Sequence, residues 1–139
     1  MIAEIVRQWD ARKDVLRERF TAKHPESYEV VVRLLVEVVL TEGVLGGVYK
    51  LDAKRIHVID DGDYQGTLIF LIGLDSYQPG PEEYIWLHNY YGSCSGCDTL
   101  KGISDYNDDP PSAKQVEEYM TLAMHMVQRM KWLDTGREG

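Results

Sequence analysis

The run from Thr67 to Leu74 (TLIFLIGL) is the most apolar stretch of the chain and constrains its fold most. Its length and branched side chains predict a central strand buried on both faces. A strand is also expected at Lys54–Asp60, ahead of an Asp-Gly turn typical of a hairpin, and another at Tyr84–Tyr91 after the loop at 75–81. Short turns between these segments predict an antiparallel sheet of three or four strands.

Two helices are expected before the sheet. Residues 2–20 place apolar side chains on one stripe of an otherwise charged segment, as an amphipathic helix does. Residues 26–42 fit two templates, because alternate positions are apolar but polar residues recur every fourth position. We interpret this segment as a helix that ends at Gly43, since its length is unusual for a strand. For Val30–Leu40 the sequence alone does not decide between a helix and a strand. If the segment is a helix, it would form an αα-hairpin with the first helix.

A third helix is expected near the C-terminus. Ser112 and Gln115 have the spacing of a capping box, and Gly136 is the expected stop. Three of the eight apolar positions that follow are methionine, which favours either packing on the sheet or an adaptable binding surface. These elements predict an α+β fold in a single domain over residues 1–139, with the last helix packed on the sheet.

The negative charge is concentrated in the middle of the chain. The net charge is −8, and residues 52–111 carry all of it, with eleven acids against three bases. Direct nucleic-acid binding is disfavoured, because phosphate contact needs a basic surface. No apolar run is long enough to span a bilayer and the N-terminus resembles no signal peptide, so we expect a cytoplasmic protein.

Both cysteines of the chain, Cys94 and Cys97, form a C-x-x-C in a glycine-rich loop. Two thiolates at this spacing can hold a metal, form a redox disulfide, or simply pack a shaped loop. Zinc would need further ligands, of which His88 is the best placed on the preceding strand. If the thiols only pack the loop, Asp98 is expected to bond the loop backbone. If they form a redox pair, the charge of Asp98 would raise the pKa of Cys97 and so disfavour its reactive thiolate. No cofactor other than this zinc is indicated.

The carboxylates Asp60, Asp61 and Asp63 stand around the predicted hairpin turn. Their spacing matches the start of an EF-hand loop, but Ile72 occupies the position that requires a bidentate glutamate. We therefore interpret them as a solvated turn. The sequence indicates no nucleophilic or acid–base catalytic set, and we expect no enzyme.

Aromatic residues gather on the third predicted strand. Tyr84, Trp86, His88 and Tyr90 alternate onto one face, with Tyr77 and Tyr106 in neighbouring loops. This face could be an exposed aromatic patch, or the last helix could cover it; the sequence leaves both open.

The segment Tyr90–Leu100 (YYGSCSGCDTL) resembles a motif of small uncharacterised proteins found mostly in phage genomes. In these proteins an aromatic strand end leads into Gly-Ser-Cys-Ser-Gly-Cys-Asp, and a terminal helix follows. The resemblance implies a small accessory protein in the host cytosol, of a kind that commonly binds and blocks a host component. It assigns no catalytic residue.

The leading hypothesis is a non-enzymatic protein-binding module, a phage-type inhibitor of a host protein. Its expected contact residues form an acidic, tyrosine-rich surface: Asp60, Asp61, Asp63, Tyr77, Tyr84, Trp86, Tyr90, Tyr106, Asp108 and Asp109. The alternative is a metal-binding or thiol redox protein built on Cys94 and Cys97 with His88.

Overall fold

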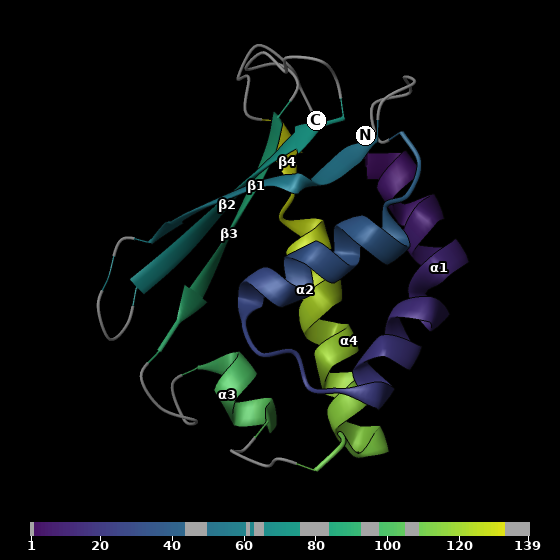
Figure 1. Ribbon diagram of the computed structural model, residues 1–139, viewed down its shortest axis with the longest axis vertical. Helices are drawn as coiled ribbons and strands as arrows, with labels where there is room; N and C mark the ends of the chain where they lie inside the picture. The colour runs from purple at the N-terminus through teal and green to yellow at the C-terminus, as the bar shows by residue number, and fades with distance from the viewer. Residues whose placement is uncertain are drawn as a thin grey trace.

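The fold is α+β, with a four-stranded antiparallel sheet and helices on one side of it (Figure 1). The computed structural model describes residues 2–43, 50–60, 62, 66–75, 84–92, 98–104 and 109–132. The strands follow chain order across the sheet: β1 (Leu51–Asp60), β2 (Gly66–Leu74), β3 (Tyr84–Tyr91) and β4 (Lys131–Trp132). The helices are α1 (Ile2–Ala22), α2 (Tyr28–Leu34), its π-helical continuation η1 (Leu35–Val39), α3 (Thr99–Ser104) and α4 (Ala113–Gln128).

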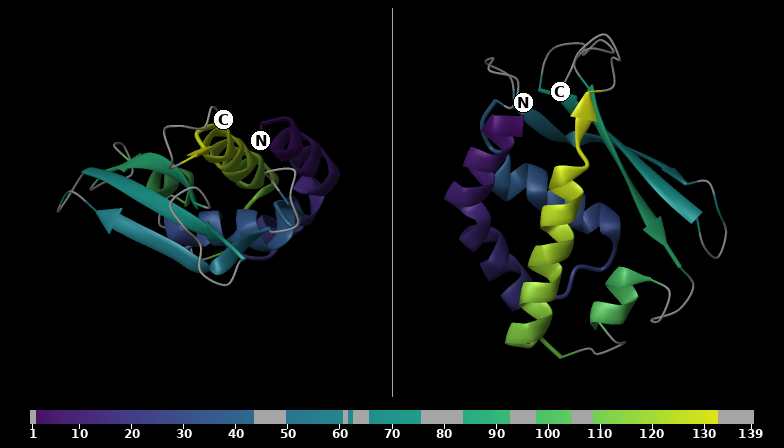
Figure 2. Two further views of the ribbon diagram at one scale, coloured as in Figure 1. Left: turned by 90° about the horizontal axis from the view of Figure 1, so that it is seen from above. Right: turned by 180° about the vertical axis from the view of Figure 1, so that it is seen from behind.

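The predicted sheet is confirmed, with one difference in burial. Helices α2, η1 and α4 pack on one face of it, and α1 packs on α4 and η1 on the same side of the sheet (Figure 2). On that face Phe70, Ile72 and Leu74 of β2 are buried. Ile69 and Leu71, on the other face, are only partly buried, so the expectation that β2 is buried on both faces is wrong.

The segment over Val30–Leu40 is helical, as interpreted from its length. Helix α2 forms its first part, and Ser27 caps the start of this helix by accepting from the Val30 N–H at 3.2 Å. The segment then continues as η1. Its valines and leucines are buried except Val30 and Leu34, which are partly buried. Glu29 and Arg33 form an exposed ion pair at 2.8 Å. The polar period of four therefore indicated the conformation better than the valine content did.

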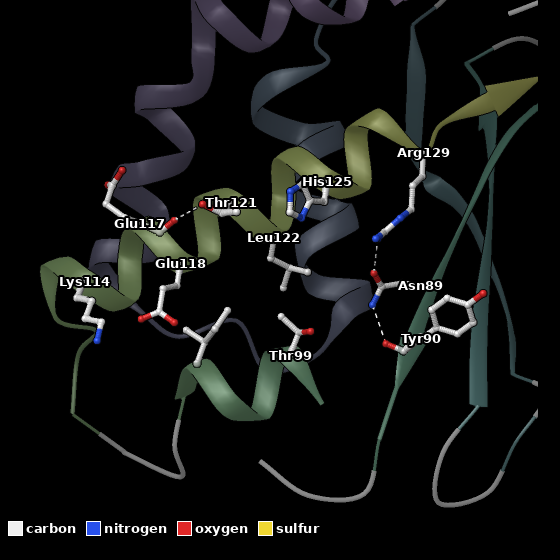
Figure 3. Close-up of a pocket in the computed structure, with 11 residues that line it drawn as sticks. Asn89, Tyr90, Thr99, Lys114, Glu117, Glu118, Thr121, Leu122, His125 and Arg129 are labelled. Carbon is white, nitrogen blue, oxygen red and sulfur yellow. Dashed lines mark hydrogen bonds between the residues drawn. The ribbon is translucent and has the colours of Figure 1, made fainter. Parts of the chain in front are cut away.

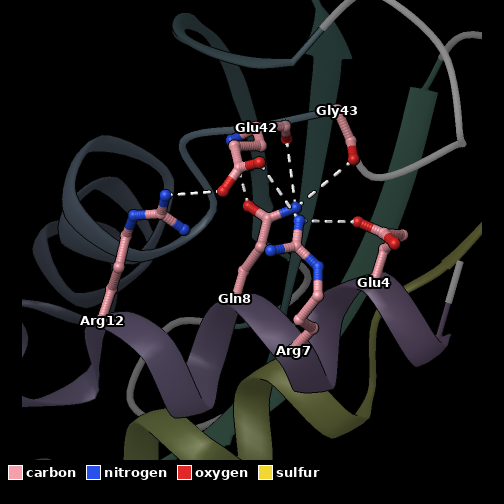
Figure 4. Close-up of polar contacts among 6 residues, drawn as sticks. All are labelled: Glu4, Arg7, Gln8, Arg12, Glu42 and Gly43. Atoms are coloured by element: carbon pink, nitrogen blue, oxygen red, sulfur yellow. Dashed lines mark hydrogen bonds and ion pairs between the residues drawn. The ribbon is translucent and has the colours of Figure 1, made fainter.

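A buried glutamine of α1 holds the end of the α2–η1 segment (Figure 4). Gln8 is fully buried; its Oε1 accepts from the Glu42 N–H at 3.0 Å, and its Nε2 donates to the carbonyls of Glu42 and Gly43. The Glu42 carboxylate also pairs with Arg7 at 3.2 Å and Arg12 at 2.6 Å. The apolar stripe expected over residues 2–20 includes Val6, yet Val6 is 53% exposed.

Helix α4 begins where it was expected but ends earlier. The capping box is present, with the Gln115 N–H donating to Ser112 Oγ and the Ser112 N–H to Gln115 Oε1. The helix ends at Gln128 rather than at Gly136, because the chain turns at Arg129 and β4 pairs with Ile85 and Trp86 of β3. The methionines Met120, Met126 and Met130 are buried, so this face of α4 belongs to the core.

Candidate functional site

The face of the sheet turned away from the helices carries the predicted aromatic row. Residues paired across antiparallel strands share a face, so the register places side chains of all three long strands there. We call this surface the open sheet face; it comprises Arg55, His57, Ile59, Thr67, Ile69, Leu71, Gly73, Tyr84, Trp86, His88 and Tyr90. Among the described helices, α4 contacts β3 on the opposite face, where Ile85, Leu87 and Asn89 are buried.

The rings of the open sheet face contact one another in sequence along β3. The His88 ring lies between Trp86, at a centroid distance of 6.1 Å, and Tyr90, at 5.6 Å in an edge-on arrangement. On β1, which β2 separates from β3, the His57 ring lies 6.3 Å from the Tyr84 ring. These contacts join Trp86, His88 and Tyr90 into one row of rings and pair Tyr84 with His57.

The described helices do not cover this surface, and part of it is exposed to solvent. Tyr90 is 69% exposed and Ile59 is 48% exposed, while Trp86 and His88 are half-buried by their neighbours. A solvated antiparallel sheet face normally carries polar side chains. Apolar residues at these outward positions of β1, β2 and β3 make this face a candidate contact surface.

One glycine shapes the open sheet face. Gly73 is paired with Tyr84, whose ring lies over it; a Cβ at this position would come within 2.9 Å of Tyr84 Cε1 and 3.3 Å of the Arg55 Cβ. A contact of 2.9 Å is closer than van der Waals packing allows. Gly73 thus lets the Tyr84 ring lie against the sheet.

The described acidic residues of the expected site lie away from this row. The exposed Asp60, at the end of β1, is on the helix side of the register; its carboxylate accepts from the Tyr91 hydroxyl at 2.5 Å and from the Gly62 N–H at 3.0 Å. These bonds hold the pKa of Asp60 below its usual value. Asp109 lies before α4, where its carbonyl bonds His24 Nε2 at 2.8 Å.

The structure therefore unites Tyr84, Trp86, His88 and Tyr90 and separates them from Asp60 and Asp109. The other expected contact residues lie outside the described residues: Asp61, Asp63, Tyr77, Tyr106 and Asp108. Cys94 and Cys97 also lie outside them. Within the described ranges, no group of three or more histidines, cysteines and acids could hold a metal ion, and His88 lies between two aromatic rings.

The base of the cysteine loop is described, and it is held by Asp98. This buried carboxylate accepts from the Gly92 N–H and the Tyr28 hydroxyl, both at 2.8 Å, and from the Lys101 N–H at 3.1 Å. Lys101 Nζ closes the same base by donating to the Gly92 carbonyl at 3.3 Å. The expectation that Asp98 bonds the loop backbone is confirmed at Gly92.

Asp98 also starts α3, an element that sequence reasoning missed. Its carboxylate receives the third N–H of the helix, and the Tyr28 hydroxyl receives the second, that of Leu100, at 3.1 Å. Burial raises the pKa of Tyr28 above its usual value, so its hydroxyl stays protonated and donates to Asp98. An aspartate directly before Thr99 was the available signal, but the short run through Gly102 concealed the helix.

No protein-family model matches the chain, and neither the curated proteins nor the solved structures compared with it give a match. Among the described helices, none has the length and apolar character needed to cross a membrane.

Proposed function

We propose that this protein is a non-enzymatic protein-binding module, a phage-type inhibitor of a host protein, and that the open sheet face contacts its partner. The observation that carries the proposal is the row of Tyr84, Trp86, His88 and Tyr90 on a face that the described helices leave uncovered. Tyrosine and tryptophan are the residues enriched at the centres of protein interfaces.

The chemistry of the row suits contact with an apolar partner surface. In the described part of the chain, neither ring nitrogen of His88 bonds a carboxylate or a hydroxyl, and its neighbours are the rings of Trp86 and Tyr90. Such a row supplies large apolar area with few rotatable bonds, and its phenol and imidazole groups can form hydrogen bonds at the rim.

One described acidic residue, Asp60, lies at the edge of this surface. Asp60 follows Ile59 at the end of β1, is exposed, and points to the other side of the sheet. The partner is therefore expected to present an apolar centre and basic groups around it. Opposite charges at a rim speed association more than they add affinity.

The test compares proteins retained from a bacterial lysate by the immobilised chain and by two double variants. Trp86→Ser with Tyr90→Ser removes two rings of the open sheet face. Val6→Ser with Val15→Ser is the matched control, since these two residues are exposed on α1. We expect a protein retained by the unchanged chain and by the control but lost with the first variant. The same retention by all three would refute the proposal, provided that their thermal unfolding agrees.

A further inference from the structure

A groove lies on the helix side of the sheet, between α4, α3 and the second half of β3 (Figure 3). Its volume is about 590 Å³. It is separate from the open sheet face, because Asn89 faces the groove while the rings of His88 and Tyr90 lie on the other side of β3.

One wall is a stripe along α4. Lys114, Glu118, Leu122, His125 and Arg129 line the groove at spacings of three or four residues, so they lie above one another on one side of the helix. From the first to the last, the stripe is about 22 Å long at 1.5 Å per residue. An extended peptide of about seven residues has this length. The apolar side chain in the middle of the stripe is the buried Leu122.

The facing wall includes an unpaired strand edge. Strand β4 pairs only with Ile85 and Trp86, and no other described strand pairs with the remaining edge of β3. The Tyr90 carbonyl points into the groove, where it accepts from Asn89 Nδ2 at 3.0 Å. In an antiparallel ladder the N–H and C=O of one residue point to the same edge, so the Tyr90 N–H points to this edge as well. An exposed strand edge is a template for an added strand.

The guanidinium of Arg129 lines the groove and bonds a neutral side chain, that of Asn89. Arg129 is half-buried, and its Nη1 donates to Asn89 Oδ1 at 2.9 Å. No carboxylate of the described residues pairs with it, and His125 lies one turn before it on the same stripe. At the other end Glu117 is already bound to Arg17 at 2.8 Å. An incoming carboxylate would therefore find its complement at Arg129.

We infer that this groove binds an extended peptide segment of a partner protein. The segment adds a strand to β3 at Tyr90, rests an apolar side chain on Leu122, and places an acidic side chain or a C-terminal carboxylate at Arg129. This surface is independent of the open sheet face, so the protein would have two contact surfaces on opposite sides of β3.

The experiment selects peptides from an immobilised random library with the full chain and measures the affinity of a selected synthetic peptide by fluorescence anisotropy. We expect an acidic residue at a constant place in the selected sequences. Arg129→Gln, which retains an amide donor for Asn89, should weaken binding at least about tenfold, because a charge-assisted bond is lost. Arg19→Gln, an exposed change on α1, is the matched control and should leave the affinity unchanged.

Two further measurements locate the peptide. Thr99→Trp should fill the groove and abolish binding, whereas Thr21→Trp on exposed α1 should not. Hydrogen exchange of the Tyr90 amide should slow in the complex, since that N–H would join a ladder. Trp86→Ser should leave this binding intact, which separates the groove from the open sheet face. Failure to select a peptide, or binding that tolerates both Arg129→Gln and Thr99→Trp, would overturn the inference.

Discussion

At the scale of single residues, Gly73 matters because it has no side chain. Gly73 lies in β2 among branched residues, where a glycine weakens a strand by about 0.5–1 kcal/mol relative to alanine. The Tyr84 ring occupies the space above it. The cost of the glycine is offset by the position it allows the ring to take on the open sheet face.

Gly73→Ala should therefore lower the free energy of unfolding by about 1–3 kcal/mol, because its Cβ would overlap the Tyr84 ring and meet Arg55. Gly102→Ala is the matched control, since Gly102 is exposed in α3 and its substitution should stabilise by up to about 1 kcal/mol. Urea unfolding measures both. A neutral Gly73→Ala would show that the ring moves aside without cost.

A second residue pair ties the end of α1 to α4. His24 Nε2 must donate to the Asp109 carbonyl, so in the neutral ring Nδ1 accepts from the Tyr119 hydroxyl at 2.6 Å. Tyr119 is fully buried and its ring also packs on Phe20. The histidine thereby satisfies a polar group inside the core.

His24→Ala should lower the free energy of unfolding by about 1–3 kcal/mol, because the buried Tyr119 hydroxyl loses its partner. Adding Tyr119→Phe should recover part of this loss. His125→Ala, an exposed change on α4, should remain within about 0.5 kcal/mol of the unchanged chain. Chemical denaturation distinguishes them; equal stability of the His24 and His125 variants would contradict the assignment.

Stability should also fall in alkali. Burial, with a contribution from the Glu118 carboxylate, raises the pKa of Tyr119 to about 12. In the unfolded chain a tyrosine loses its proton near pH 10. Between these values the folded state holds the proton and the unfolded state does not, so stability decreases as the pH rises. Urea midpoints from pH 8 to 12 should fall less steeply for Tyr119→Phe than for Tyr90→Phe, which alters an exposed ring.

At the scale of elements, α3 shows how one carboxylate can organise several segments. Asp98 joins Gly92 at the end of β3, Lys101 in α3 and Tyr28 in α2. A helix of six residues is too short to be stable by itself, so its formation depends on these bonds and on the burial of Leu100 and Ile103.

Asp98→Ala should cost about 3 kcal/mol or more, because it leaves two backbone N–H groups and the Tyr28 hydroxyl without their acceptor. Ser112→Ala removes a cap at the exposed start of α4 and should cost about 1 kcal/mol. The comparison is made by urea unfolding. Equal costs would mean that Asp98 acts only as a helix cap and does not hold the loop base.

At the scale of the whole molecule, the decisive feature is that the long helices share one side of the sheet (Figure 2). Apolar side chains of β1, β2 and β3 remain on the other side, with Tyr90 the most exposed. Both proposed surfaces meet at β3, since its rings lie on the open sheet face and the edge that no described strand pairs with faces the groove beside α4.

A dye that fluoresces on apolar surfaces should bind the native protein at the open sheet face. Trp86→Ser with Tyr90→Ser should reduce the signal roughly twofold, because two of the large rings are removed. Val6→Ser with Val15→Ser should have little effect, since these α1 side chains are exposed singly. A signal unchanged by the first variant would place the apolar surface elsewhere.

Much of the fold could be predicted because its causes are local. Strand β3 has the predicted bounds, the Ser112 capping box is present, and the four-residue polar period of Glu29 and Arg33 indicated a helix. The early end of α4 could not be predicted in this way. It depends on pairing of Lys131 with Trp86, a residue distant in the chain. The burial and hydrogen bonds of Gln8 could not be predicted for the same reason, since its partners Glu42 and Gly43 belong to another segment.

The sequence by itself determined the α+β class, the alternation of Tyr84, Trp86, His88 and Tyr90 on one face, and the charge of the middle region. Strand period and helix caps depend on neighbouring residues, so they can be inferred from the chain alone. Only the tertiary structure decided which face of β3 the helices cover, and that Asp60 lies apart from the aromatic row. Those outcomes depend on how apolar surfaces distant in sequence pack together, which no local pattern specifies.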